Sequence, residues 1–140
     1  LRLGGTDIPF EMHLEGHSEG DVLLHAIASA ILGGAGLGDL GAHFPPGAPE
    51  LAGIDSAEIV RQSRSKAEDA GWLAAYLDAT IVAQRPRLSA YLARIEQNVS
   101  SVLGLAQDLV NVKVTSTDHV GAIGDGEGIA AQAVVTLRAR

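Results

Sequence analysis

The sequence contains no cysteine, so disulfide bonds and thiolate metal ligands are both excluded. Aromatic residues make up only 4% of the 140 residues, whereas hydrophobic residues make up 46%. The core must therefore consist mainly of Leu, Ile, Val and Ala. A chain of this length is typical of one domain and buries roughly two-thirds of its unfolded surface. Any metal site in it must use His, Asp and Glu.

Long apolar runs and clusters of basic residues are missing as well. No stretch approaches the roughly 20 apolar residues of a membrane-spanning helix, and no secretory signal opens the chain. We therefore expect a cytoplasmic protein without a membrane partner. The formal net charge is −7 and no basic stripe is present, which argues against a nucleic-acid partner. An anionic ligand would have to be held by backbone N–H groups, a metal or single cationic side chains.

Apolar periodicity predicts an α+β domain. Glycine-rich segments at 33–53 and 121–128 indicate loops, and a loop as long as the first is usually functional. The predicted order is strand, helix, helix, strand, helix, strand, strand, which favours a small, mainly antiparallel or mixed sheet with helices on one face. The predicted helices begin near His17–Asp21, Asp55 and Ser89 and end near Gly33, Gly71 and Leu103; the predicted strands cover Leu77–Gln84, Val110–Thr115 and Ile129–Leu137, after a first strand that includes Leu1–Gly4.

Polar residues gather where the first helix is predicted to start. Ser18 and Asp21 have the spacing of a capping box. Asp21 lies four residues before His25 and therefore on the same helix face, and His17 can approach them if it precedes the regular helix. His17, Asp21 and His25 suit a metal or phosphate site. The alternative is an ordinary polar helix start.

Two further segments carry candidate chemistry. Asp39 lies among glycines in the first loop, where a carboxylate can hold sugar hydroxyls, unless the glycines serve only a turn. Hydroxyls at Thr115–Thr117, with Asp118 beside them, suit phosphate oxygens and a divalent cation, or alternatively form a plain hairpin loop. We expect His13 and His43 to be solvated loop residues.

These segments, taken in order, resemble the signature blocks of the 2-C-methyl-D-erythritol 2,4-cyclodiphosphate synthases, a family of the non-mevalonate isoprenoid pathway. The resemblance covers almost the whole chain. The blocks that carry it are His17–Ala26 (HSEGDVLLHA), Leu37–Gly41 (LGDLG) with Phe44–Pro45, Gly53–Ser56 (GIDS), Thr80–Arg87 (TIVAQRPR), Val110–Lys113 (VNVK), Thr115–Asp118 (TSTD) and Gly126–Ala130 (GEGIA).

The resemblance implies a homotrimer of α+β subunits with active sites between protomers. It also implies a phosphorus–oxygen lyase that converts 4-diphosphocytidyl-2-C-methyl-D-erythritol 2-phosphate to 2-C-methyl-D-erythritol 2,4-cyclodiphosphate and releases CMP. The implied cofactors are Zn²⁺ and a second ion, Mg²⁺ or Mn²⁺.

Residue roles follow from the same resemblance. His25 would be a zinc ligand and Asp118 a ligand of the second metal. Thr117 and Asp118 would take part in catalysis. The substrate-binding residues would be His17 and Ser18 at the phosphates, Asp39 and Gly41 at the methylerythritol hydroxyls, Thr115 and Ser116 at the diphosphate, and Ala83, Gln84, Pro86, Arg87 and Leu88 in a cytosine pocket.

The chain also departs from the family pattern. The other two zinc ligands of the family come from an N-terminal Asp-x-His pair, and no such pair precedes His17. Because Leu1–Gly4 reads as the middle of a strand, we expect residues 1–140 to be a single domain whose N-terminal strand and metal-binding segment precede this sequence. Substitutions relative to the family are Pro46, Ala52, Asp118, His119 and Asp125. They leave an alternative open, a catalytically impaired trimeric nucleotide-binding relative without zinc.

Overall fold

The computed structural model describes residues 1–10 and 20–140. Its main sheet has three strands in the order β4-β3-β5. The central strand β3 (Trp72–Val82) pairs in parallel with β4 (Val110–Thr115) and antiparallel with β5 (Ala130–Ala139). The predicted mixed sheet is therefore confirmed, and β4 has the predicted bounds.

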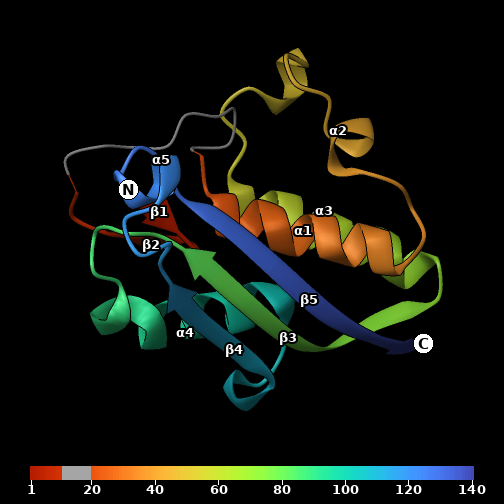
Figure 1. The fold of residues 1–140 in the computed structure, drawn as a ribbon. Helices are drawn as coiled ribbons and strands as arrows, with labels where there is room; N and C mark the ends of the chain where they lie inside the picture. Colours follow the sequence, from red (N-terminus) through yellow and green to blue (C-terminus); the bar gives the residue numbers. More distant parts are fainter. Residues whose placement is uncertain (11–19) are drawn as a thin grey trace.

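Three helices cover one face of this sheet (Figure 1). α1 (Val22–Gly34) packs on β5, α3 (Ser56–Asp69) on α1 and β3, and α4 (Leu92–Leu103) on β4. Along β3, Leu77, Ala79 and Ile81 are buried, whereas the residues that alternate with them are only partly buried. The helices therefore lie on one side, as predicted, and the core between the layers is almost wholly aliphatic.

The central strand begins five residues earlier than its alternation predicts. Trp72–Tyr76 belongs to β3, but the register with β5 shifts between Ala74 and Tyr76. An extra residue at a bulge interrupts the two-residue alternation of a strand, so this half of β3 shows no clear pattern. The last strand is likewise shifted to Ala130–Ala139.

The first predicted strand does not join the main sheet. β1 (Arg2–Leu3) and β2 (Thr6–Asp7) form a separate antiparallel pair. The Asn98 side chain on α4 donates to the Thr6 hydroxyl at 2.7 Å. The pair therefore packs against the start of α1 and the middle of α4 rather than extending the sheet.

Short helices occupy both glycine-rich segments that were predicted as loops. α2 (Leu40–His43) and the 3₁₀ turn η1 (Pro49–Leu51) lie in the first, and α5 (Gly121–Gly124) lies in the second. One turn is too short to produce a recognisable periodicity. Two more 3₁₀ turns, η2 (Ser89–Tyr91) and η3 (Gln107–Leu109), precede α4 and β4. Within residues 1–10 and 20–140, no helix is both long and apolar enough to cross a membrane.

Candidate active site

Asp21 begins α1 and is completely buried. Its Oδ1 accepts hydrogen bonds from the backbone N–H of Leu24 and Gly4, both at 3.0 Å, and its Oδ2 accepts one from Gly5 at 2.9 Å. Burial raises the pKa of Asp21, although these three bonds and the nearby His25 oppose the shift. Asp21 therefore caps the helix and anchors the β1–β2 turn. The hypothesis that it binds metal or phosphate is wrong, because both of its oxygens face the protein interior.

His25 lies one helical turn after Asp21 and is half-buried. Its Nε2 lies 3.3 Å from the Ser56 hydroxyl at the start of α3. Burial lowers the pKa of His25 below its ordinary value, and the charge of Asp21 only partly opposes this. The imidazole is thus held in its neutral form, which is the form that binds a metal ion.

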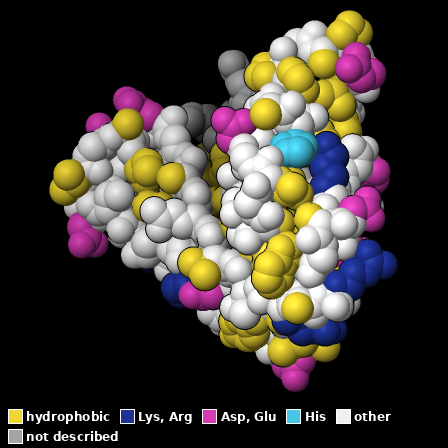
Figure 2. Space-filling model, turned by 90° about the vertical axis from the view of Figure 1, so that its right-hand side faces the viewer, with side chains coloured by type: hydrophobic (Ala, Val, Ile, Leu, Met, Phe, Trp, Pro, Cys, Tyr) yellow, Lys and Arg dark blue, Asp and Glu magenta, His cyan; other side chains and the backbone are white. Residues whose placement is uncertain are grey.

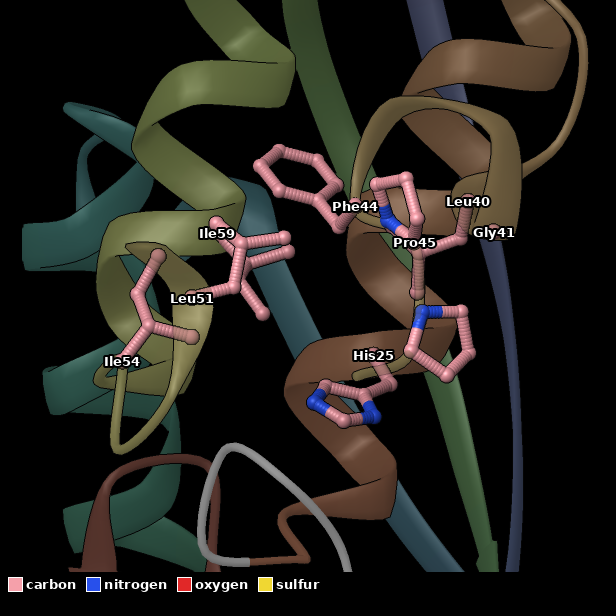
Figure 3. Close-up of a pocket in the computed structure, with 9 residues that line it drawn as sticks. His25, Leu40, Gly41, Phe44, Pro45, Leu51, Ile54 and Ile59 are labelled. Atoms are coloured by element: carbon pink, nitrogen blue, oxygen red, sulfur yellow. The ribbon is translucent and has the colours of Figure 1, made fainter. Parts of the chain in front are cut away.

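A cavity of about 220 Å³ opens beside this ring. In Figure 3, Leu51, Ile54 and Ile59 lie on one side of it, Leu40, Phe44 and Pro45 lie on the other, and the His25 ring lies below them. Gly41 also lines the cavity, whereas Asp39 is exposed and accepts a hydrogen bond from Ala42 N–H at 2.9 Å as the N-cap of α2. His25 therefore borders a largely apolar space. The carboxylate of Asp39 directly precedes the lining residue Leu40 in the sequence but does not itself line the cavity.

The wall formed by α2 is tied to α3 through His43. Its Nε2 donates to the Leu37 carbonyl at 2.7 Å, and its Nδ1 then accepts from Lys66 Nζ at 2.9 Å. Lys66 also lies 5.2 Å from the centre of the Phe44 ring. The expectation that His43 is a solvated loop residue is therefore wrong, since both ring nitrogens are bonded. Sequence reasoning missed it because its partners lie 6 and 23 residues away.

A second cavity, of about 220 Å³, lies where β3 and β4 end. Parallel strands bring their carboxyl ends to the same edge of a sheet, and residues that follow them meet there. The Ala83 N–H donates to the Thr115 carbonyl at 2.9 Å and joins the two segments. Seven of the predicted substrate-binding residues line this one cavity: Ala83, Gln84, Pro86, Arg87, Leu88, Thr115 and Ser116.

The two predicted catalytic residues follow β4 in a tight turn. Thr117 donates its hydroxyl proton to the Val120 carbonyl at 2.7 Å, so this hydroxyl supports the turn. Asp118 is exposed, and its Oδ1 lies 3.4 Å from the Ser116 hydroxyl. Both residues adjoin the strand-end cavity without lining it. His17, Ser18 and His13 lie outside the described residues.

The described residues do not make a complete metal centre. Within residues 1–10 and 20–140, no group of three His, Asp or Glu side chains is placed to hold an ion. His25 suits a zinc ion as a single neutral nitrogen ligand, but a protein zinc site normally has three or four ligands. We therefore derive no chemical step through zinc from these residues.

Figure 2 shows one face of the molecule, on which acidic and basic side chains are interspersed. Hydrophobic side chains gather toward the top of this view, at the height at which α2 and η1 lie in Figure 1. This apolar region adjoins the cavity at His25, because Leu40 and Leu51 from those two elements line it.

The fold and the two cavities define an α+β protein with a histidine site and a separate strand-end site. The model of the YgbB family matches residues 1–138. The chain is 48% identical over 137 residues to the 2-C-methyl-D-erythritol 2,4-cyclodiphosphate synthase of Thiobacillus denitrificans, covering 98% of this chain and 86% of that protein. It is 48% identical to the enzyme of the same name from Geobacter metallireducens, over 100% of this chain and 89% of that one. This chain belongs to the YgbB family.

Solved structures agree. The bifunctional IspDF of Campylobacter jejuni superposes with a TM-score of 0.95 at 36% identity; the match covers 100% of this chain but only 38% of that longer one. A 2C-methyl-D-erythritol-2,4-cyclodiphosphate synthase in a CDP-bound form superposes with a TM-score of 0.90 at 28% identity, over 99% of this chain and 89% of that one. The predicted family resemblance is confirmed by sequence and by fold.

Proposed function

We propose that this chain converts 4-diphosphocytidyl-2-C-methyl-D-erythritol 2-phosphate to 2-C-methyl-D-erythritol 2,4-cyclodiphosphate and CMP. An oxygen of the 2-phosphate attacks the β-phosphorus, and the bond from that phosphorus to the oxygen bridging to the α-phosphate breaks. The electron pair leaves with CMP, and the new P–O bond closes the ring. No protein nucleophile is required, so the protein acts by positioning the groups and stabilising charge.

The strand-end cavity is the observation that carries this proposal. Seven residues assigned to the cytidine and diphosphate lie around one space, although they come from segments about thirty residues apart. The similar structure with CDP bound supports the same kind of ligand. Ala83 to Leu88 would hold the cytosine largely through backbone groups, and the hydroxyls of Thr115 and Ser116 would face the diphosphate.

The cavity at His25 would hold the other end of the substrate. Asp39 and Gly41 would bind the methylerythritol hydroxyls, and the apolar walls would exclude water from the reacting groups. His17 and Ser18, close to His25 along the chain, would contact the phosphates. Thr117 would hold the turn on which Asp118 faces the diphosphate, and Asp118 would carry Mg²⁺ or Mn²⁺.

The two cavities share no lining residue. A substrate that needs both can therefore be bound where the histidine cavity of one subunit meets the strand-end cavity of another. This separation supports a homotrimer with active sites between protomers, which the sequence resemblance implies. In a closed ring of three subunits, the histidine cavity of each subunit can meet the strand-end cavity of its neighbour, so that three equivalent sites form.

The alternative is an impaired nucleotide-binding relative without zinc. It rests on substitutions such as Asp125, which is exposed and acidic where the family has Arg. The identity of 47–48% to enzymes of this name, over nearly the full chain, does not favour it.

Hybrid oligomers give a direct test. His25→Ala and Asp118→Ala variants should each release little CMP from the diphosphocytidyl substrate. If the two residues come from different protomers, random hybrid trimers made by unfolding and refolding a one-to-one mixture regain about a quarter of native sites. Recovery near that level would support the shared site. A mixture in which mass spectrometry detects hybrid trimers but which releases no CMP would contradict the shared site. A native chain that releases no CMP would contradict the proposed enzymatic activity.

A further inference from the structure

The turn that follows β4 has a strained backbone. Asp118 has φ of 51° and His119 has φ of 65°, and these are the two non-glycine residues in the left-handed region among the described residues. For residues with a Cβ this conformation brings the Cβ close to the following carbonyl oxygen and is unfavourable. Two consecutive residues adopt the left-handed conformation only where hydrogen bonds or packing around them stabilise it.

Part of that support is local. The Ser116 hydroxyl accepts a hydrogen bond from the Asp118 N–H at 3.2 Å, and the Val120 N–H donates to the Thr117 carbonyl at 3.0 Å. Gly124 contributes by having no side chain, because a Cβ there would overlap the backbone of His119. All these groups lie within the segment that contains the turn.

One hydrogen bond comes from a different segment. The Gln84 side-chain Oε1 accepts from the His119 N–H at 2.9 Å, across 35 residues of sequence. Gln84 is half-buried and also lines the strand-end cavity. A side chain that bonds the left-handed residue itself can select this backbone conformation, because the N–H would point elsewhere in any other.

We propose that the Gln84 side chain, whose backbone alone would face the cytosine, is a positioning group that holds the Asp118–His119 turn in its left-handed conformation. This inference rests on the proposed function and deepens it. The side-chain oxygen is used by the turn rather than by the base, so Gln84 fixes where Asp118 lies relative to the diphosphate. The cytosine then depends on the other groups of the strand-end cavity.

The test combines two substitutions. Gln84→Leu removes the acceptor and should lower kcat for CMP release about tenfold, with the affinity for CMP measured by calorimetry unchanged. Adding His119→Gly should restore most of the lost kcat, because glycine adopts positive φ without the steric cost. Gln97→Leu, on the exposed face of α4, is the matched control and should retain the native kcat.

Two results would overturn the inference. One is a loss of CMP affinity in Gln84→Leu as large as the loss of kcat, which would place Gln84 on the base. The other is failure of His119→Gly to restore kcat in a double variant that folds normally.

Amide hydrogen exchange separates this inference from the proposed function. The His119 N–H should exchange slowly in the native chain and faster in Gln84→Leu, whether or not the chain releases CMP. If the His119 N–H exchanges slowly in a native chain that releases no CMP, the proposed function is contradicted but the hydrogen bond from His119 to Gln84 is supported. Equal exchange in the two chains would overturn the positioning role.

Discussion

The two cavities of this chain are built in opposite ways. The cavity at His25 lies among helices and short turns, and apolar side chains form its walls. The strand-end cavity lies at the edge of a sheet, and its lining adds three hydroxyls, an amide and a guanidinium to four apolar residues. The first is therefore suited to exclude water around one neutral imidazole, and the second to hydrogen-bond a polar ligand. The difference indicates that affinity for a nucleotide and the chemical step can be altered separately.

The largest effect is expected at Asp21, which caps the helix that carries His25. Asp21→Ala leaves two buried N–H groups and one partly buried N–H group without their acceptor and should lower the free energy of unfolding by about 3–5 kcal/mol. Urea denaturation measures this. Asp55→Ala, which removes an exposed N-cap of α3 with one side-chain hydrogen bond, is the control and should cost about 1 kcal/mol. Equal losses would show that the bonds to Gly4 and Gly5 contribute nothing.

Substitution of His25 would separate the two cavities most clearly. His25→Ala should lower kcat/KM for CMP release about a hundredfold, equivalent to about 2.7 kcal/mol, while the affinity for CMP stays native. Ser56→Ala removes the 3.3 Å contact to the ring but keeps the imidazole itself, and should have a smaller effect. If His25→Ala weakens CMP binding as strongly as it slows the reaction, the two cavities do not have separate roles.

A glycine substitution tests the strand-end region in the same way. In Gly124→Ala the new Cβ overlaps the backbone of His119, so the turn must shift, at a cost of about 1–3 kcal/mol. We expect kcat to fall while His25 keeps its native NMR chemical shifts. Gly128→Ala is the matched control because its Cβ would meet no atom within 4 Å. A loss of activity in Gly128→Ala equal to that in Gly124→Ala would contradict the steric explanation.

The smallest effect concerns the exposed face of the sheet. Asp78 accepts hydrogen bonds from Lys113 Nζ at 2.7 Å and from Asn111 at 3.0 Å, and these bonds lower the pKa of Asp78. A lowered folded-state pKa means that the stabilisation is present above the unfolded-state value and is lost as the pH falls through the folded-state value. Lys113→Met should raise the pKa of Asp78 toward its ordinary value, which carboxyl NMR titration measures. Asp78→Asn should remove this part of the pH dependence of stability. If the free energy of unfolding falls at acid pH in the same way in Asp78→Asn and in the native chain, Asp78 does not cause that fall.

Much of the fold could be predicted because its signals are local. The helix from Asp55 was found from its cap and apolar periodicity, and the structure shows Asp55 capping α3 through Ala57 N–H at 3.0 Å. The strand Val110–Thr115 alternates without interruption and was placed correctly. The first half of β3 was missed because its bulge breaks the alternation, and α2 was missed because four residues produce no periodicity.

The candidate site was predicted in part for the same reason. The order of the motifs indicated which segments carry polar groups, and the seven residues around the strand-end cavity were named from it. The role of Asp21 was misjudged because its partners, Gly4 and Gly5, reach it only through tertiary packing. The bond between Gln84 and His119 was missed because 35 residues separate its partners.

The sequence by itself determined the family, the α+β class and the approximate positions of the three long helices and of β4, because periodicity, caps and motifs act over a few residues. Only the tertiary structure decided which polar groups are hydrogen-bonded within the protein and which face a cavity. Only packing removes water from a side chain and brings distant N–H groups to it, and this process buried Asp21, tied His43 to Lys66 and brought Gln84 to the turn.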